Sequence, residues 1–65
     1  MGNFQRALTQ DDVGRRVWFR VVTRWGICRG PRVIRTVDED LQRVTVRLGG
    51  WSHFGIRHNE IEDVA

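Results

Sequence analysis

The stretch that decides the fold runs from Arg43 to Arg57 and reads RVTVRLGGWSHFGIR. Apolar and polar residues alternate on both sides of a glycine pair, which is the pattern of two antiparallel strands joined by a turn. For the apolar residues of both strands to share one face, Leu48 must pair with Ser52, which leaves residues 49–51 as the loop. The side chains expected on this face are Val44, Val46, Leu48, Phe54 and Ile56.

The rest of the chain supplies three more short strands. Alternation predicts a strand over residues 16–22, with Val17, Phe19 and Val21 on the buried face. Residues 33–37 and 62–65 read as the second and the last strand, and single helical turns are expected at residues 9–12 and 58–61. Residues 23–32, rich in glycine and with the only proline, are expected to form a long loop whose Trp25 and Ile27 fold back over the core. The sequence therefore predicts an all-β, five-stranded small barrel.

Length and composition restrict the organisation of the chain. Its 65 residues make one domain, expected over residues 8–65, after a flexible tail at residues 1–7. Cys28 is the only cysteine, and the two histidines are too few for a structural zinc site, so no disulfide, metal or cofactor is expected. No apolar run approaches the roughly 20 residues of a membrane span, and no export signal is recognised. A cytoplasmic location is expected for such a free thiol.

All eleven basic residues are arginine, and the net charge is +3. Codon usage in a GC-rich genome is one explanation for the absence of lysine. The other is functional, because guanidinium groups make paired hydrogen bonds to phosphate or carboxylate. The acidic residues cluster at residues 11–12, 38–40 and 60–63, so the surface is expected to carry separate patches of each sign.

The polar side of the predicted hairpin is the first candidate site. Like charges that face each other across a strand pair are destabilising unless a partner neutralises them, and a phosphate backbone is such a partner. A solvated sheet face and an acidic protein partner are the alternatives. The residues predicted to bind DNA or RNA are Arg35, Arg43, Arg47, His53 and Arg57.

The three tryptophans, Trp18, Trp25 and Trp51, are the second candidate site. They are interpreted as plugs of the barrel ends, as platforms for bases, or as a cage for a cation or a proline-rich peptide. A further alternative is self-association into a homo-oligomer, because tryptophan and arginine are enriched at interface hot spots.

Two segments carry a resemblance to known proteins: DVGRRVWF at residues 12–19 and GIRHNEIEDV at residues 55–64. With the predicted strand order, they make the chain resemble the Src-homology-3-like small barrels, the group that includes Tudor and KOW-type domains. The resemblance implies a binding module of the bacterial or phage type. The chain departs from the KOW pattern because residues 33–37 lack glycine, and from the Tudor cage because it has no tyrosine.

An enzymatic function is not expected. Type II dihydrofolate reductases are similar small barrels, but their Val-Gln-Ile-Tyr stretch corresponds here to Phe54-Gly55-Ile56-Arg57, which keeps only the isoleucine. Cys28 is far in sequence from both histidines, and no nucleophile signature surrounds it. The leading hypothesis is a non-enzymatic module that binds nucleic acid through the hairpin arginines. The alternative is a protein-interaction or self-associating barrel that uses the tryptophans.

Overall fold

The computed structural model describes residues 4–50 and 52–65. Almost all of this part of the chain is short strands and tight turns, so the predicted all-β class is confirmed. Single 3-10 turns, η1 (Gln10–Asp12) and η2 (His58–Glu60), lie where helical turns were predicted. The strands are β1 (Arg16–Thr23), β2 (Gly26–Arg29), β3 (Arg32–Asp38), β4 (Arg43–Gly49), β5 (Ser52–Arg57) and β6 (Ile61–Val64).

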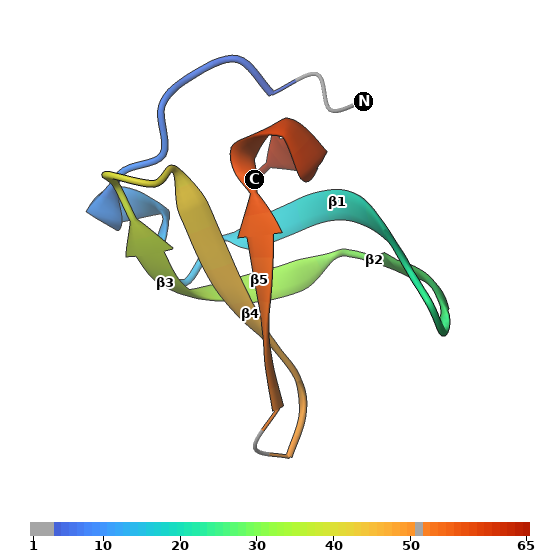
Figure 1. Cartoon of the computed structure of the whole chain (residues 1–65). Helices are drawn as coiled ribbons and strands as arrows, with labels where there is room; N and C mark the ends of the chain where they lie inside the picture. The colour runs from blue at the N-terminus through green and yellow to red at the C-terminus, as the bar shows by residue number, and fades with distance from the viewer. Residues whose placement is uncertain (1–3, 51) are drawn as a thin grey trace.

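The strands form one antiparallel sheet that curls into a half-barrel (Figure 1). Their hydrogen-bonded order is β2-β1-β3-β4-β5, and β6 also pairs with β1. β2 and β3 pair one after the other with the same strand, β1. Arg20 pairs with Arg29 and Arg16 pairs with Val33, so the register along β1 does not shift between β2 and β3. The Gly30 N–H donates to the Phe19 carbonyl at 3.2 Å and keeps this register between the two strands. β2 and β3 thus act as one interrupted strand, which reconciles the six observed strands with the five predicted.

The register predicted for the β4–β5 hairpin is confirmed along most of its length, since Val44 pairs with Ile56 and Val46 with Phe54. The loop end differs from the prediction, because Gly49 rather than Leu48 pairs with Ser52. An irregularity between Arg47 and Gly49 absorbs the extra residue. Trp51 lies outside the described residues.

The core fills the concave side of the curled sheet. Most of the side chains predicted to be buried are buried, but Phe54 and Leu48 are only half-buried, and they pack against the edge of the core. Phe4 also packs there, ahead of the first turn. The buried apolar side chains are Leu8, Val17, Phe19, Ile34, Val37, Val44, Val46, Ile56 and Ile61.

The prediction of a long loop over residues 23–32 is wrong. Thr23 pairs with Gly26 around a two-residue turn, and β2 follows directly. The turn directs Trp25 outward, so its side chain is 87% exposed, and Ile27 is also exposed. Neither covers the core. The turn residues Arg24 and Trp25 carry none of the Asn-Gly or Asp-Gly character by which such hairpins are recognised in a sequence.

Gly30 occupies a position where a side chain has no room. A Cβ at this residue would collide with the Val17 carbonyl oxygen and lie 3.2 Å from the Phe19 ring. Gly30→Ala is therefore expected to lower the free energy of unfolding by about 1–2 kcal/mol, measured by urea denaturation. Gly55→Ala is the matched control, because a Cβ there meets nothing within 4 Å. Equal stabilities of the two variants would show that β1 does not approach Gly30 this closely.

Candidate nucleic-acid interface

The outer face of the β4–β5 hairpin brings four predicted site residues together in two facing pairs. Arg43 pairs with Arg57, and four residues along the strand Arg47 pairs with His53. All four side chains are exposed. Residues directly opposite each other in an antiparallel pair have Cβ atoms about 4.5–5.5 Å apart, so each pair sets two basic groups side by side.

Arg35 lies at an irregularity in β3, the strand that pairs with β4. Ile34 pairs with Val46 and Thr36 with Thr45, so Arg35 is the extra residue between them. The hydroxyls of Thr36 and Thr45 lie 2.6 Å apart and join the two strands beside it. Such bulges commonly re-aim a side chain, and Arg35 is exposed here. We call the surface formed by Arg35, Arg43, Arg47, His53 and Arg57 the basic face.

The basic face has little compensation from carboxylates. Within residues 4–50 and 52–65, the only ion pair shorter than 4 Å joins Arg6 to Asp12, neither of which belongs to this face. Arg43 has one acidic neighbour, because Asp38 is its partner on β3. Arg47 has His53 as its partner on β5. The positive charge at the Arg47 end of the basic face is therefore less compensated by carboxylates than the charge at the Arg43 end.

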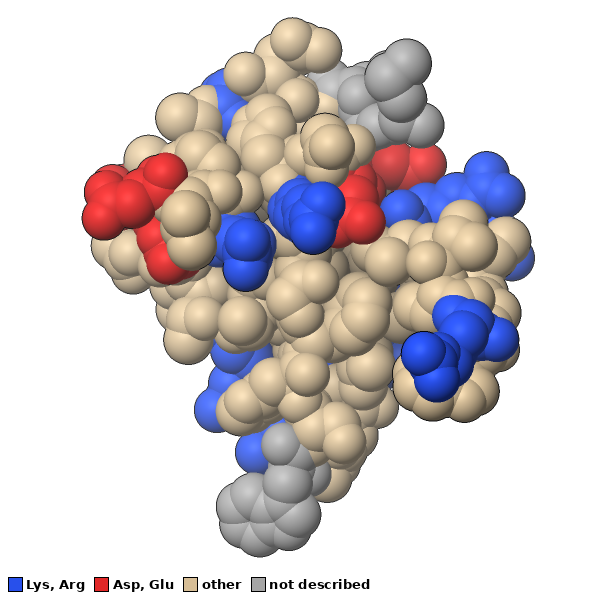
Figure 2. All heavy atoms as spheres, viewed as in Figure 1, with Lys and Arg blue, Asp and Glu red and all other residues tan. Residues whose placement is uncertain are grey.

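Charged side chains of both signs gather on the face of the molecule seen in Figure 2. In Figure 2 one acidic group lies at the left edge, where Figure 1 places the turn between β3 and β4, and a second lies right of centre, directly beside basic side chains. Basic side chains lie in the centre of the view, at its lower left and at its right. In this view the basic side chains at the lower left have no acidic side chain beside them, so an anionic partner can approach this region without meeting carboxylates.

The tryptophans predicted as a second site occupy different parts of the sheet. Trp18 is half-buried on β1, where it pairs with Asp63 of β6. Trp25 lies at the β1–β2 turn, and the guanidinium carbon of Arg24 stands 5.3 Å from the centroid of its ring. Trp51 is outside the described residues. The structure thus supplies one strongly exposed indole, at Trp25.

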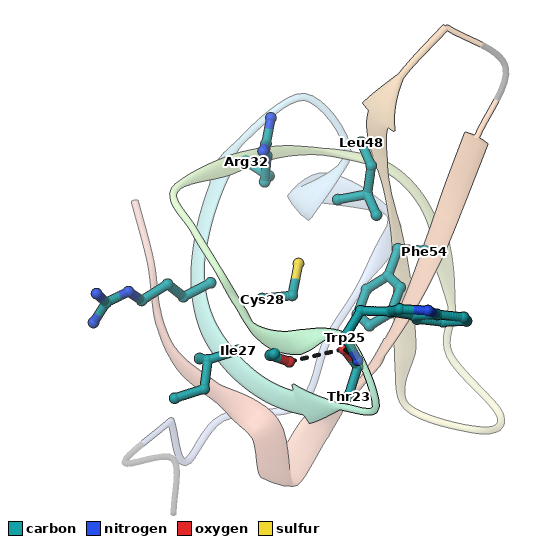
Figure 3. Close-up of a pocket in the computed structure, with 9 residues that line it drawn as sticks. Thr23, Trp25, Ile27, Cys28, Arg32, Leu48 and Phe54 are labelled. Atoms are coloured by element: carbon teal, nitrogen blue, oxygen red, sulfur yellow. Dashed lines mark hydrogen bonds between the residues drawn. The ribbon is translucent and has the colours of Figure 1, made fainter.

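A pocket of about 470 Å³ lies between the β1–β2 hairpin and the ends of β4 and β5 (Figure 3). Leu48 and Phe54 extend into it from β4 and β5, and the Cys28 thiol points inward from β2. Behind Phe54, the buried ring of Phe19 stacks at 6.4 Å between centroids. The residues that line the pocket are Thr23, Trp25, Gly26, Ile27, Cys28, Arg29, Arg32, Leu48 and Phe54.

Sequence reasoning did not identify this pocket or the arginines at it, Arg29 and Arg32. The lining residues are spread over more than half of the domain and meet only because the sheet curls. The available signal was the alternation around residues 26–29, where Cys28 faces Val21 across the strand pair. Read as a strand, that segment would have directed Cys28 inward.

No group of three or more His, Cys, Asp or Glu side chains gathers as a metal site within the described ranges. In the same ranges, neither helical turn has the length or apolar character needed to cross a membrane. A comparison with known proteins finds no matching family model, no matching curated protein and no matching solved structure.

Proposed function

We propose that this chain is a small, non-enzymatic module that binds nucleic acid by holding its phosphate backbone on the basic face. The observation that carries the proposal is the facing of Arg43 with Arg57 and of Arg47 with His53, all exposed. Facing cations destabilise a strand pair, and phosphates that neutralise them supply a binding free energy through counterion release.

The spacing of the basic face suits a phosphate backbone. The two facing pairs are four residues apart along β4, which corresponds to about 13 Å in an extended strand. One strand of B-form DNA carries a phosphate for about every 3.4 Å of helix axis, so more than one phosphate lies within that length. A backbone lying along the hairpin therefore reaches both pairs.

The proposal includes affiliation with the Src-homology-3-like small barrels, of which Tudor and KOW-type domains are examples. The curled antiparallel sheet of short strands supports it, as does the continuity of β2 and β3 along β1.

Replacing Arg47 with glutamine tests the basic face where it is least compensated. Removing one phosphate contact is expected to flatten the slope of log affinity against log salt by about one unit. The measurement is fluorescence anisotropy with mixed-sequence oligonucleotides between about 50 and 200 mM salt. Stability should change by less than about 0.5 kcal/mol, because the Arg47 side chain is exposed.

Arg16→Gln is the matched control. It removes the same charge from the exposed start of β1, which β3 separates from β4. This variant should keep the wild-type salt slope. Absence of binding by the wild type at the lowest salt concentration, or equal slopes for the two variants, would contradict the proposal.

The exposure of Trp25 favours a second class of function, contact with a protein partner or a second copy of the chain. Such an interface depends mainly on apolar burial, so its affinity should change little with salt. Analytical ultracentrifugation at high protein concentration tests self-association directly. A dimer that Trp25→Ser converts to monomer would support this alternative.

A further inference from the structure

The pocket beside Cys28 combines an apolar interior with a basic rim. Leu48 and Phe54 supply apolar surface beside the Cys28 thiol, and the exposed Trp25 indole stands at the margin. Its volume of about 470 Å³ lies within the range of pockets that enclose small ligands. The pocket can therefore enclose a flat apolar group of modest size.

Cationic groups lie at the rim of this apolar interior. Arg29 and Arg32 are lining residues, the lining contains no acidic residue, and Arg24 stands against the Trp25 ring. A ligand that matches both features has a flat apolar part and a negative charge next to it. A nucleotide has this composition, because its base can stack on an aromatic side chain while its phosphate contacts guanidinium groups.

The pocket adjoins the basic face. Leu48 follows Arg47 in β4, and Phe54 follows His53 in β5, so the inner and outer sides of one hairpin end carry the two surfaces. A backbone that follows the basic face past this end arrives at the pocket. In a duplex the bases are paired and stacked, and bringing one into a pocket requires flipping it out. In a single strand the bases are already free to turn.

We propose that the pocket receives one unpaired base of the nucleic acid held on the basic face, with Trp25 and Phe54 as its aromatic contacts. The ligand is accordingly a single strand, or a loop with unpaired bases. This inference rests on the proposed function and adds the class of nucleic acid. Arg32, whose partner on β1 is the buried Val17, contacts the phosphate next to the inserted base.

The first test compares an oligonucleotide with an abasic strand of the same length, which keeps the phosphates and lacks the bases. The wild type is expected to bind the base-containing single strand about tenfold more tightly than the abasic strand or the matched duplex. Trp25→Ala should abolish this preference while leaving the salt slope unchanged, because no charge is removed. Val22→Ser is the control, since Val22 is an exposed apolar residue of the same hairpin outside the pocket lining.

Cys28 gives a second readout that does not depend on affinity. It is the only cysteine of the chain and lies in the pocket lining, so its alkylation by iodoacetamide reports on access to the pocket. The rate of alkylation should fall when the base-containing strand is bound and stay unchanged at equal occupancy by the abasic strand.

The outcomes separate the inference from the proposed function. Salt-dependent binding with equal affinity for base-containing and abasic strands, or without protection of Cys28, overturns the pocket assignment and leaves the basic face intact. Absence of binding to any strand at low salt overturns both. Protection of Cys28 by an acidic peptide that contains tryptophan, without any dependence on bases, assigns the pocket to a protein partner and also overturns the inference.

Discussion

Replacing Phe19 with alanine is expected to lower the free energy of unfolding by about 3–5 kcal/mol. The Phe19 side chain is fully buried near the middle of β1, and its ring stacks on Phe54. A single core in a domain of this size rarely supplies more than about 3–5 kcal/mol in total, so the variant should be largely unfolded at 25 °C. Circular dichroism and urea denaturation measure the effect.

Val22→Thr is the control for this experiment. Val22 lies on the same strand with 76% of its side chain exposed, and threonine keeps the β-branched shape that strands favour. Its stability should remain within about 0.5 kcal/mol of the wild type. A Phe19→Ala variant whose free energy of unfolding falls by less than about 1 kcal/mol would show that Phe19 is not part of the core.

The fold was largely predictable because the alternation over β4 and β5 allows only one arrangement. Shifting the register by one residue would expose Val44 and Val46 and bury Arg43 and Arg47, which no small core can tolerate. The same constraint predicts that the two basic pairs lie opposite each other. The alternation of apolar and polar residues in β4 and β5 thus indicates which side chains face the concave core and which form the basic face.

β2 was not predictable by the same reasoning. Its turn, Arg24-Trp25, has no residue that favours a left-handed conformation, and the glycines that suggested a loop have other roles. Gly30 lets β1 approach closely, and Gly26 ends the turn with φ near 120°. The pocket was missed for a related reason, since residues from Thr23 to Phe54 meet there only through the curl of the sheet.

Asp12 also escaped prediction, because an acidic residue in the first turn of a helix is usually solvated. The structure buries it, with 1% of its surface exposed, under the segment that precedes the turn. Arg6 donates from Nη1 to Oδ2 at 3.0 Å and from Nη2 to Oδ1 at 2.6 Å. The Thr9 N–H donates to Oδ2 at 3.0 Å. Nothing in the local sequence shows that Arg6 turns back to this carboxylate.

Asp12→Asn is expected to lower the free energy of unfolding by about 2–3 kcal/mol at neutral pH. The amide keeps the shape of the side chain but can accept at only one of the two positions that Arg6 and Thr9 use. A larger effect is not expected, because Arg6 is 48% exposed and water compensates part of its lost contact. Asp11→Asn is the matched control, since Asp11 is exposed in the same turn and should change stability by less than about 0.5 kcal/mol.

The dependence of stability on pH distinguishes the charge of Asp12 from its shape. The hydrogen bonds from Arg6 hold the pKa of Asp12 below its ordinary value of 3.8, and this effect exceeds the opposing effect of burial. Because the folded state holds the proton less tightly than the unfolded state, the contribution is complete above the ordinary pKa and is lost as the pH falls through the lowered one. The stability difference between wild type and Asp12→Asn, measured by urea denaturation, should therefore shrink as the pH is lowered from about 5. A difference that stays constant over this acidic range would mean that the ionised carboxylate does not stabilise the fold.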